Sequence, residues 1–405
     1  MTAQSIRPLL LAHYTLSSCL GSGLDATYAA LQAQRSGLSD AAFETARLPC
    51  YTGRVAGVEA VSLPAELAAY DCRNNQLAWL CLQQDGFIDA ALAARARYGA
   101  TRIGLFLGTS TAGILQTELA YRQLDTEGHF QPGFHYAETH NTYSVAAFVR
   151  AALGLQGPAV VVSTACSSSA KVFANAQRMM AAGLIDAAIV GGVDSLCLTT
   201  LYGFNSLQLL SSQVCRPFDA ARDGLSIGEA AAFVLLERED ARPARADDIL
   251  LLGVGESADA HHMSAPHPEG LGAQRAIRAA LAQAGIGAED IDYINLHGTA
   301  TPSNDAAEGR AVASVFGAET PCSSTKGATG HTLGAAGGIE ALISALALRH
   351  AFIPGGLHLQ QLDPALAINY QSANRPAALR RVLSNSFGFG GTNCSLVLGL
   401  RGALQ

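Results

Sequence analysis

The sequence predicts a layered α/β fold in which two sheets enclose a central layer of helices, in the order α/β/α/β/α. Apolar runs with strand character alternate with helical patterns along most of the chain, and this alternation is typical of sheets covered by helices. Two expected helices, Cys166–Ala182 and Leu333–Leu348, are rich in small residues and poor in charge. Helices of that composition are usually buried on all sides, so they are the expected central layer.

The first half of the chain, residues 1–240, is expected to begin with a strand and to be helix-rich up to residue 100. Residues 114–150 carry mixed helical and loop signals. The elements expected in this half are helices at Gly23–Leu31 and Asn74–Gln84, and strands at Ile103–Leu107, from Val160 toward Cys166, at Ala187–Val193 and at Ala231–Glu237.

A loop around Arg238–Asp248 marks the expected joint between the halves. The second half, residues 241–405, repeats the alternation. Its expected strands are Ile249–Gly255, Asp292–His297, Pro321–Ser324, Arg381–Ser386 and Cys394–Gly399, and its expected helices are Ala273–Ala284, Asp305–Phe316 and Leu333–His350. Each half contains a strand followed by a small-residue helix, which suggests an internal duplication.

The composition narrows the class of protein. Of 405 residues, 49% are hydrophobic and 15% charged, which suits a large core. The net charge of −7 argues against nucleic acid as a partner. The nine cysteines form no CxxC pair, so neither a metal site nor a disulfide framework is expected. No apolar run approaches the roughly 20 residues that span a bilayer, and Met1–Ala12 lacks a signal pattern, so we expect a soluble cytoplasmic protein without a membrane partner.

Cys166 stands where an apolar, β-branched run ends and a run of small residues begins, within Val160–Ala170. The pattern predicts a buried strand that turns sharply into a helix, with the thiol at the helix start. First-turn N–H groups and the positive end of the helix dipole stabilise a thiolate at such a position, so a nucleophile is expected. A buried structural cysteine is the alternative, and it is the plain explanation for most of the other eight.

Three further candidates lie in glycine-rich settings, which let backbone approach a ligand closely. His297 follows an apolar strand, and strand ends are where ligand sites form. Lys326, one of only two lysines, lies five residues before His331 at the start of the second buried helix. Glu340 lies within that helix, where a buried acid needs a partner such as Lys326. The alternatives are a satisfied loop histidine for His297 and a helix-surface position for Glu340.

The run Ser384–Asn393 contains Phe387, Phe389 and three glycines. Glycines allow an unusual backbone path. The N–H of Phe389 is therefore a candidate donor of an oxyanion hole, the set of donors that stabilises the negative oxygen of an acyl-transfer intermediate. A simple turn with both phenylalanines in the core is the alternative.

These pieces, in this order, resemble the elongating β-ketoacyl–acyl-carrier-protein synthases of the thiolase superfamily. The resemblance covers roughly residues 20–400 and rests on the runs Thr164–Ser168, Arg216–Asp219 with Arg222–Gly224, His297–Thr301, Lys326–His331 and Asn385–Asn393. It implies a five-layered thiolase fold with two pseudo-equivalent halves, one with the cysteine and one with both histidines and the lysine. The first strand, Ile6–His13, departs from the family's valine-rich pattern, which puts its pairing in doubt.

The resemblance implies a decarboxylative Claisen condensation. Cys166 takes an acyl chain from the phosphopantetheine arm of an acyl carrier protein, and N–H groups of Cys166 and Phe389 stabilise the oxyanion. His297 and His331, as neutral donors, then hold the thioester oxygen of malonyl–carrier protein while carbon dioxide leaves. The resemblance also implies that Lys326, tied to Glu340, orients His331, and that Thr299 and Thr301 hydrogen-bond the pantetheine arm. Phe387 and Phe389 would form the gate, with Asp259 in a loop beside it. Thr111 would border the acyl pocket, and ordinary loop variation is the alternative for that residue.

No permanently bound cofactor is implied, because the phosphopantetheine arm arrives with the carrier protein. That acidic partner is expected to dock on arginines such as Arg73 and Arg216. The alternative for Arg216 is that it forms a structural ion pair with Asp219. A second subunit is implied, as a homodimer or as a heterodimer with a chain length factor. Arg73–Asn75 and Gly191–Asn205 resemble synthases of aryl polyene clusters, which leaves aryl and alkyl primers open.

Two rival functions remain at this stage. A non-catalytic chain length factor would lack the nucleophile. A thiolase would act on coenzyme A thioesters with a second cysteine, and Cys394 does not sit in the thiolase motif.

Overall fold

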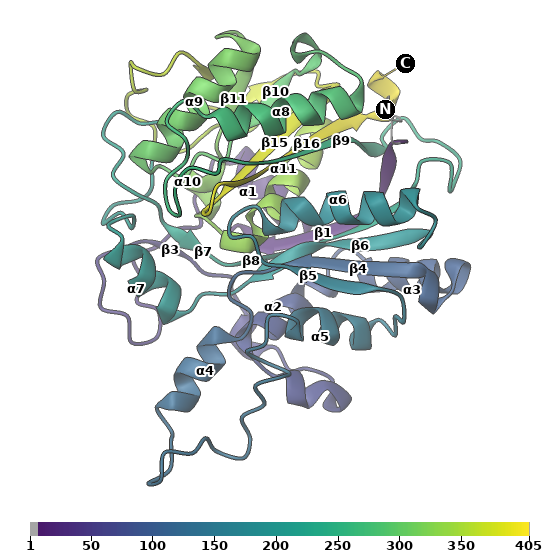
Figure 1. Ribbon diagram of the computed structural model, residues 1–405, viewed down its shortest axis with the longest axis vertical. Coiled ribbons are helices and arrows are strands. Elements are labelled where there is room, and N and C mark those ends of the chain that lie inside the picture. Colours follow the sequence, from purple (N-terminus) through teal and green to yellow (C-terminus); the bar gives the residue numbers. More distant parts are fainter. Residues whose placement is uncertain (1–6, 405) are drawn as a thin grey trace.

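The structure is a computed structural model that describes residues 7–404. Two sheets lie one above the other, with helices between them and on both outer faces (Figure 1). Helices α6 and α11 lie between the sheets and contact both of them. The five expected layers are therefore present. The bounds of the layer helices are α6 Ser168–Ala181 and α11 Ala336–His350 in the centre, α8 Leu271–Ala284 and α9 Pro302–Phe316 on the upper face, and α2 Arg73–Leu82, α3 Phe87–Tyr98 and α5 Ser144–Ala152 on the lower face.

The two sheets share one topology. The lower sheet has the order β5-β4-β6-β8-β1, with two parallel pairings followed by two antiparallel ones. The upper sheet, in the order β11-β10-β15-β16-β9, repeats that pattern, and β13 adds a further strand at its edge. Corresponding strands also follow one another in the same chain order. This repetition makes the two halves pseudo-equivalent, although no residue-level repeat is visible.

The strands of the lower sheet are β1 Leu9–Ser18, β4 Ile103–Gly108, β5 Ala159–Val162, β6 Ala187–Asp194 and β8 Ala230–Arg238. Those of the upper sheet are β9 Ile249–Ala258, β10 Tyr293–Asn295, β11 Pro321–Ser323, β13 Asn369–Tyr370, β15 Arg381–Gly388 and β16 Thr392–Leu400. The remaining elements are β2 Gly21–Ser22, β3 Thr52–Gly53, β7 Ile227–Gly228, β12 Phe352–Ile353, β14 Arg375–Pro376, α1 Leu24–Gln32, α4 Ile114–Tyr121, α7 Leu198–Ser206 and α10 Lys326–Thr329.

Strand β1 pairs fully despite its unusual sequence. It runs antiparallel to β8 along its length, with one irregularity between Leu11 and His13, and its first two residues also pair with β9. These two residues join the sheets of the two halves. The doubt about this pairing was therefore unfounded. Ile6 and the five residues before it lie outside the described part of the chain.

The expected division at residue 240 falls in the connection between β8 and β9. Both central helices begin later than the pattern suggested, because tight turns precede them: α6 starts at Ser168, and α11 follows a 3₁₀ turn at Leu333–Ala335. Within residues 7–404, no helix is long and apolar enough to cross a membrane.

Candidate active site

A cavity of about 550 Å³, counting its open mouth, opens beside the central helices. It brings together residues that are more than 200 positions apart in the chain. The expected site residues that line it are Cys166, Asp259, His297, Thr299, Thr301, His331, Phe387 and Phe389. Lys326 and Glu340 lie behind this wall, and Thr111 does not line it.

The run of serines folds the turn that carries Cys166. The Thr164 N–H donates to Ser168 Oγ at 2.9 Å, and the Ser168 hydroxyl donates to the Ala165 carbonyl at 2.5 Å. Ala165 has a φ of 52°, in the left-handed region where a residue with a side chain is strained. The small hydroxyl side chains therefore hold a sharp strand-to-helix turn, and the cysteine sits at its apex.

The duplicated topology explains why the two halves of the site meet. Cys166 follows β5, while Lys326 and His331 follow β11, which is the corresponding strand of the other half. His297 lies two residues beyond β10. Because α6 and α11 follow the corresponding strands and pack against each other between the sheets, these loops face one another.

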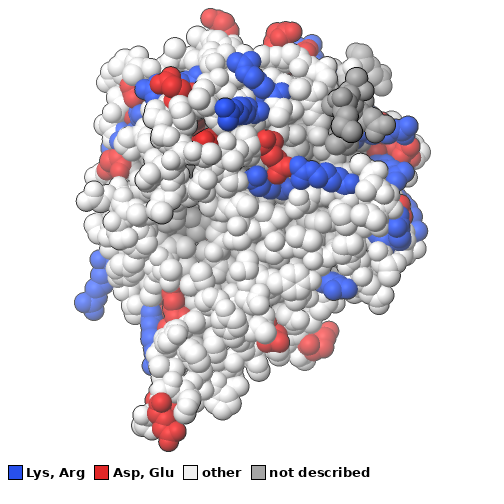
Figure 2. All heavy atoms as spheres, viewed as in Figure 1, with Lys and Arg blue, Asp and Glu red and all other residues white. Residues whose placement is uncertain are grey.

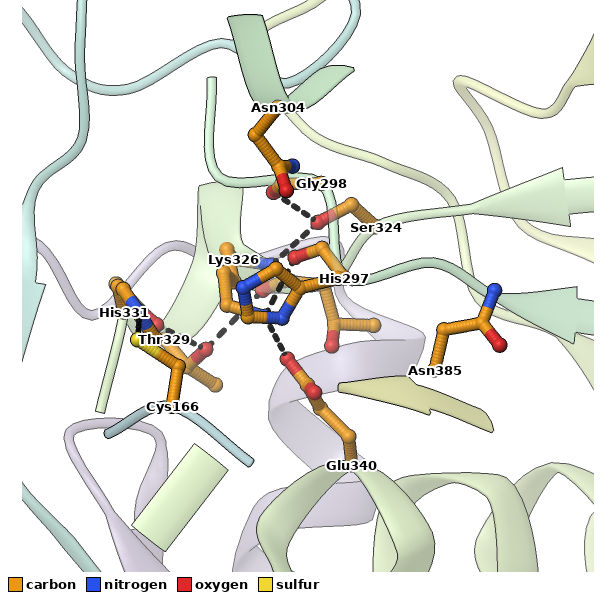
Figure 3. A network of polar contacts seen from close by, with 12 residues as sticks. Cys166, His297, Gly298, Asn304, Ser324, Lys326, Thr329, His331, Glu340 and Asn385 are labelled. Atoms are coloured by element: carbon orange, nitrogen blue, oxygen red, sulfur yellow. Dashed lines mark hydrogen bonds and ion pairs between the residues drawn. The ribbon is translucent and has the colours of Figure 1, made fainter. Parts of the chain in front are cut away.

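The sulfur and the two imidazoles form a compact cluster (Figure 3). Cys166 Sγ lies 2.9 Å from His331 Nε2. One donor atom from each of Cys166, His297 and His331 lies within 4.8 Å of the others, and all three residues are buried. The two rings stand nearly perpendicular, at 86°, with centroids 5.3 Å apart. A small acyl group at the sulfur would therefore lie within reach of both rings.

Lys326 contacts His297, not His331. Its ammonium lies 3.3 Å from His297 Nδ1, donates to the His297 carbonyl at 2.5 Å and pairs with Glu340. An ammonium has only donors, so Nδ1 must accept and Nε2 must carry the ring proton. Lys326 was expected to orient His331, and this expectation is wrong in that the ammonium directly contacts His297 and not His331. The pairing with Glu340 is present, and Glu340 is buried within α11.

His331 is held through its main chain. Its N–H donates to the Ser226 carbonyl at 2.7 Å, and its carbonyl accepts from the Gly228 N–H at 3.0 Å. Its Nδ1 is buried without a hydrogen-bond partner among the described residues. The second histidine is thus placed by backbone contacts, and neither tautomer is imposed on its ring.

Burial dominates the titration of the cluster. It raises the pKa of the Cys166 thiol to about 12, although the Lys326 charge and the Phe389 N–H oppose this shift. The resting residue is therefore a thiol, because desolvation outweighs the helix-start donors that would stabilise a thiolate. Burial, together with Lys326, lowers the pKa of both His297 and His331 well below the usual range, so both imidazoles are neutral.

The glycine-rich turn after β15 brings Phe389 to the sulfur. Phe389 lines the cavity with Cys166, and its N–H lies close enough to the thiol to oppose the rise in the thiol pKa. The ring of Phe389 packs on Phe204 of α7 with centroids 5.7 Å apart. Phe387 packs against His297 at 5.9 Å. Phe204 was not singled out from the sequence, because residues of α7 gave no strong helical signal.

Three other expected site residues are tied to their own neighbours. The hydroxyls of Thr299 and Thr301 lie 2.9 Å apart at the cavity wall. Asp259 accepts from the Asn393 side chain at 2.9 Å, which connects its loop to the Phe389 turn. Thr111 donates its hydroxyl to Asp194 at 2.7 Å and is buried away from the cavity. The assignment of Thr111 to the pocket border therefore has no support in this cavity.

Glu308 is a site-supporting residue that the sequence reading missed. It accepts the N–H groups of His297 at 2.8 Å and Gly298 at 2.7 Å, and the Asn385 amide at 3.2 Å. Burial raises its pKa to about 7. The signal available was a pair of acids, Asp305 and Glu308, on one face of the helix that follows the His297 motif.

Among residues 7–404, the Cys166, His297 and His331 donors are the one group of three with metal-binding spacing. Sulfur and imidazole are ligands that Zn²⁺ accepts. The Lys326 ammonium opposes this use, because a metal on His297 Nε2 would require a proton on Nδ1, facing another donor. The chemistry of this cluster favours hydrogen-bond donation over metal binding.

Comparison with known proteins identifies this arrangement. Residues 72–241 match the β-ketoacyl synthase N-terminal domain, and residues 250–360 match the β-ketoacyl synthase C-terminal domain. The chain is 30% identical to 3-oxoacyl-[acyl-carrier-protein] synthase 2 of Vibrio cholerae, over 97% of this chain and 99% of that protein. The chain therefore belongs to the β-ketoacyl synthase family, and it is a condensing enzyme of the acyltransferase class.

Solved structures agree with this assignment and confirm the thiolase fold. The ketosynthase ApeO of Xenorhabdus doucetiae, solved with its chain length factor ApeC, matches with a TM-score of 0.88 and 38% identity, over 99% of this chain and 100% of that one. The ishigamide ketosynthase/chain length factor matches with a TM-score of 0.88 and 29% identity, over 97% of this chain and 99% of that one. The family places this condensing enzyme in fatty acid or polyketide biosynthesis.

Proposed function

We propose that this chain elongates acyl chains carried by an acyl carrier protein, through decarboxylative condensation with malonyl–carrier protein. The observation that carries the proposal is the buried cluster of one thiol and two neutral imidazoles, in a cavity that Phe389 also lines. The phosphopantetheine arm of the carrier protein would bring each substrate through the cavity mouth.

Acyl transfer comes first. Cys166 Sγ attacks the thioester carbonyl, and the N–H groups of Cys166 and Phe389 hold the oxyanion. His331 Nε2, 2.9 Å from the sulfur, takes the thiol proton and passes it to the departing pantetheine sulfur. The new carbon–sulfur bond leaves the acyl chain on Cys166, and the carrier protein leaves as its thiol. The free Nδ1 of His331 suits this step, because the ring is not committed to one tautomer.

Decarboxylation and condensation follow. The thioester oxygen of malonyl–carrier protein accepts from Nε2 of both His297 and His331, which stabilises the enolate as carbon dioxide leaves. The enolate carbon attacks the acyl carbonyl on Cys166, and the carbon–sulfur bond breaks. The thiolate takes one proton from water, and the product is a 3-ketoacyl chain two carbons longer. Lys326 acts here by keeping the proton of His297 on Nε2.

The surroundings of Arg73 do not favour a role in carrier-protein docking. Its side chain is only 9% exposed, and it forms a two-pronged ion pair with Glu229 at 2.8 and 2.5 Å. Arg216 is half-buried, and its guanidinium donates to the Ala221 carbonyl at 3.0 Å. Burial acts to raise the pKa of Asp219, but the backbone N–H donors to that carboxylate and then the Arg216 charge lower it below its usual value. The structural alternative for Arg216 therefore has the better support.

We also propose a second thiolase-fold subunit, and among the two arrangements expected we favour a chain length factor over a second copy. Strand β5 ends its sheet with one edge unpaired, and Val160 in it is 40% exposed. Residues 121–143, which lead into α5 beside that strand, carry exposed aromatic side chains, and the centre of the face in Figure 2 has few charges. Such an edge and apolar surface normally require a cover. The neighbours that carry chain length factors support the choice.

Intact-protein mass spectrometry tests the function. The protein is exposed to a panel of alkyl and aryl acyl–carrier proteins, and the added mass identifies the primer. The mass must be absent from Cys166→Ala, and malonyl–carrier protein must then yield a 3-ketoacyl product. Acylation by acetyl-coenzyme A without any requirement for malonyl–carrier protein would instead support a thiolase. Size measurement with and without a co-expressed chain length factor tests the partner.

A further inference from the structure

Glu118 of α4 supplies the N-terminal cap of α7. One carboxylate oxygen accepts the Leu198 N–H at 2.9 Å, and the other accepts the N–H and the hydroxyl of Thr199, each at 2.6 Å. Residue Cys197, at the capping position, forms no side-chain cap of its own. A carboxylate at a helix N-terminus satisfies free N–H groups and interacts favourably with the helix dipole. The position of α7 therefore depends on a side chain from another helix.

The other end of α7 reaches the active site. Phe204, in its last turn, packs on the ring of Phe389, and both line the cavity. Phe389 shares the cavity lining with Cys166, so its N–H is the candidate oxyanion-hole donor beside the nucleophile. A rotation or shift of α7 would thus move the ring that supports an oxyanion-hole donor.

Apolar packing connects α4, α7 and the active site. Leu115 of α4 and Leu201 of α7 belong to one buried cluster. Leu225, which lines the cavity, and Leu333, two residues after His331, belong to the same cluster. Glu118 lies three residues after Leu115 on α4, and the exposed segment 121–143 follows it in the chain.

We propose that Glu118 is a positioning residue for the condensation site: its carboxylate fixes α7, which holds Phe204 against Phe389 and so keeps the Phe389 N–H at the nucleophile. The inference rests on the proposed function. Nothing in the catalytic cluster touches Glu118, so it acts entirely through α7.

The test separates acyl transfer from simple access to the sulfur. In Glu118→Gln, we expect the single-turnover rate of acyl transfer to Cys166 to fall about tenfold, because complete loss of one oxyanion donor costs about 10²–10³ and this donor is only displaced. Alkylation of Cys166 by iodoacetamide should fall less than acyl transfer, since it needs no oxyanion hole and loses only the effect of the Phe389 N–H on the thiol pKa. Thr199→Val, which removes one of the three hydrogen bonds, should show a smaller loss. Glu127→Gln is the matched control, because Glu127 lies exposed in the neighbouring segment.

A double-mutant cycle tests the route through Phe204. In a Phe204→Ala background, Glu118→Gln should cause no further loss of acyl transfer. Acyl transfer within twofold of wild type in Glu118→Gln, or losses that multiply in the double variant, would overturn the proposal. If Glu118→Gln does not fold, Thr199→Val takes its place, and an acyl-transfer rate equal to that of wild type would then overturn the proposal. Failure of the wild-type protein to accept any acyl group would instead defeat the proposed function.

Discussion

Replacing Lys326 by methionine tests the tautomer assignment at the centre of the mechanism. In the wild type, the ammonium touches His297 Nδ1 at 3.3 Å and pairs with Glu340. Methionine keeps much of the length and has no donor, so nothing compels Nδ1 to accept. The proton of the neutral ring can then move to Nδ1, and Nε2 ceases to donate into the cavity.

The size of the effect follows from the step that uses this donor. Loss of one oxyanion donor typically lowers the rate about 10²–10³-fold, or about 2.7–4 kcal/mol, so decarboxylation of malonyl–carrier protein should fall by that factor. Acyl transfer uses Cys166, Phe389 and His331, and it should fall less than about tenfold. A smaller loss is still expected there, because the Lys326 charge lowers the pKa of the thiol and its removal reverses that effect.

The assay follows the two half-reactions separately, by carbon dioxide release and by intact mass of acylated Cys166. Lys171→Met is the matched control: this other lysine pairs with Glu256 at 3.4 Å and lies outside the cavity. Removing one partner of a buried pair commonly costs about 3–5 kcal/mol, so Lys326→Met with Glu340→Gln provides a variant without the orphaned acid. Equal losses in both half-reactions, or unchanged carbon dioxide release, would refute the assignment.

Three further predictions follow from burial and packing. Iodoacetamide alkylation of Cys166 should rise about tenfold per pH unit from 7 to 10 without a plateau, since the thiol pKa is raised to about 12; a plateau near neutral pH would show a thiolate. Burial raises the pKa of Glu308 from 4.5 to about 7, so the folded state binds the extra proton and stability falls as pH rises between these values. In urea unfolding, the free energy of unfolding of Glu308→Gln should therefore rise by about 2–3 kcal/mol relative to that of wild type as the pH goes from 5 to 8. A difference between the two proteins that stays constant with pH would contradict this. In Gly337→Ala, the added Cβ would lie 2.7 Å from the Ala170 nitrogen. We expect the free energy of unfolding to fall by about 1–3 kcal/mol and turnover to fall about 10²-fold, because the site is displaced. Turnover within twofold of wild type would show that α6 and α11 can separate without harm to the site.

The alternation of strands and helices predicted the layers, because sheets covered on both faces leave long apolar runs in the sequence. The same pattern located β4, β6, β8, β9, α8 and α11 to within a few residues. It missed α3, α5 and α7 as separate elements. The polar and apolar residues of α3 and α7 do not follow a clear helical period, and tertiary contacts such as the Glu118 cap decide where α7 begins. Helix α5 is amphipathic, and its pattern was overlooked among the mixed signals of residues 114–150.

Site residues were predictable where a motif marks a strand end. Cys166 and His297 follow strand ends, His331 lies in the glycine-rich run after β11 and α10, and the structure brings the three together. The roles of Lys326 and Arg73 were not predictable in detail, because each depends on which distant partner its charge meets: His297 for one and Glu229 for the other. The state of the thiol was also misjudged, since a local helix dipole is visible in a sequence and the extent of desolvation is not.

Close approach of the two central helices is the physical condition for the 2.9 Å contact between Cys166 and His331. Glycine permits it: a Cβ on Gly337 of α11 would meet the Ala170 backbone of α6, and a Cβ on Gly108 of β4 would lie 2.3 Å from the Ser169 nitrogen. These contacts leave no room for larger side chains between the nucleophile's helix and its surroundings. The small-residue composition that marked the central layer in the sequence is therefore also what sets the reacting distance, so fold and chemistry depend on the same residues.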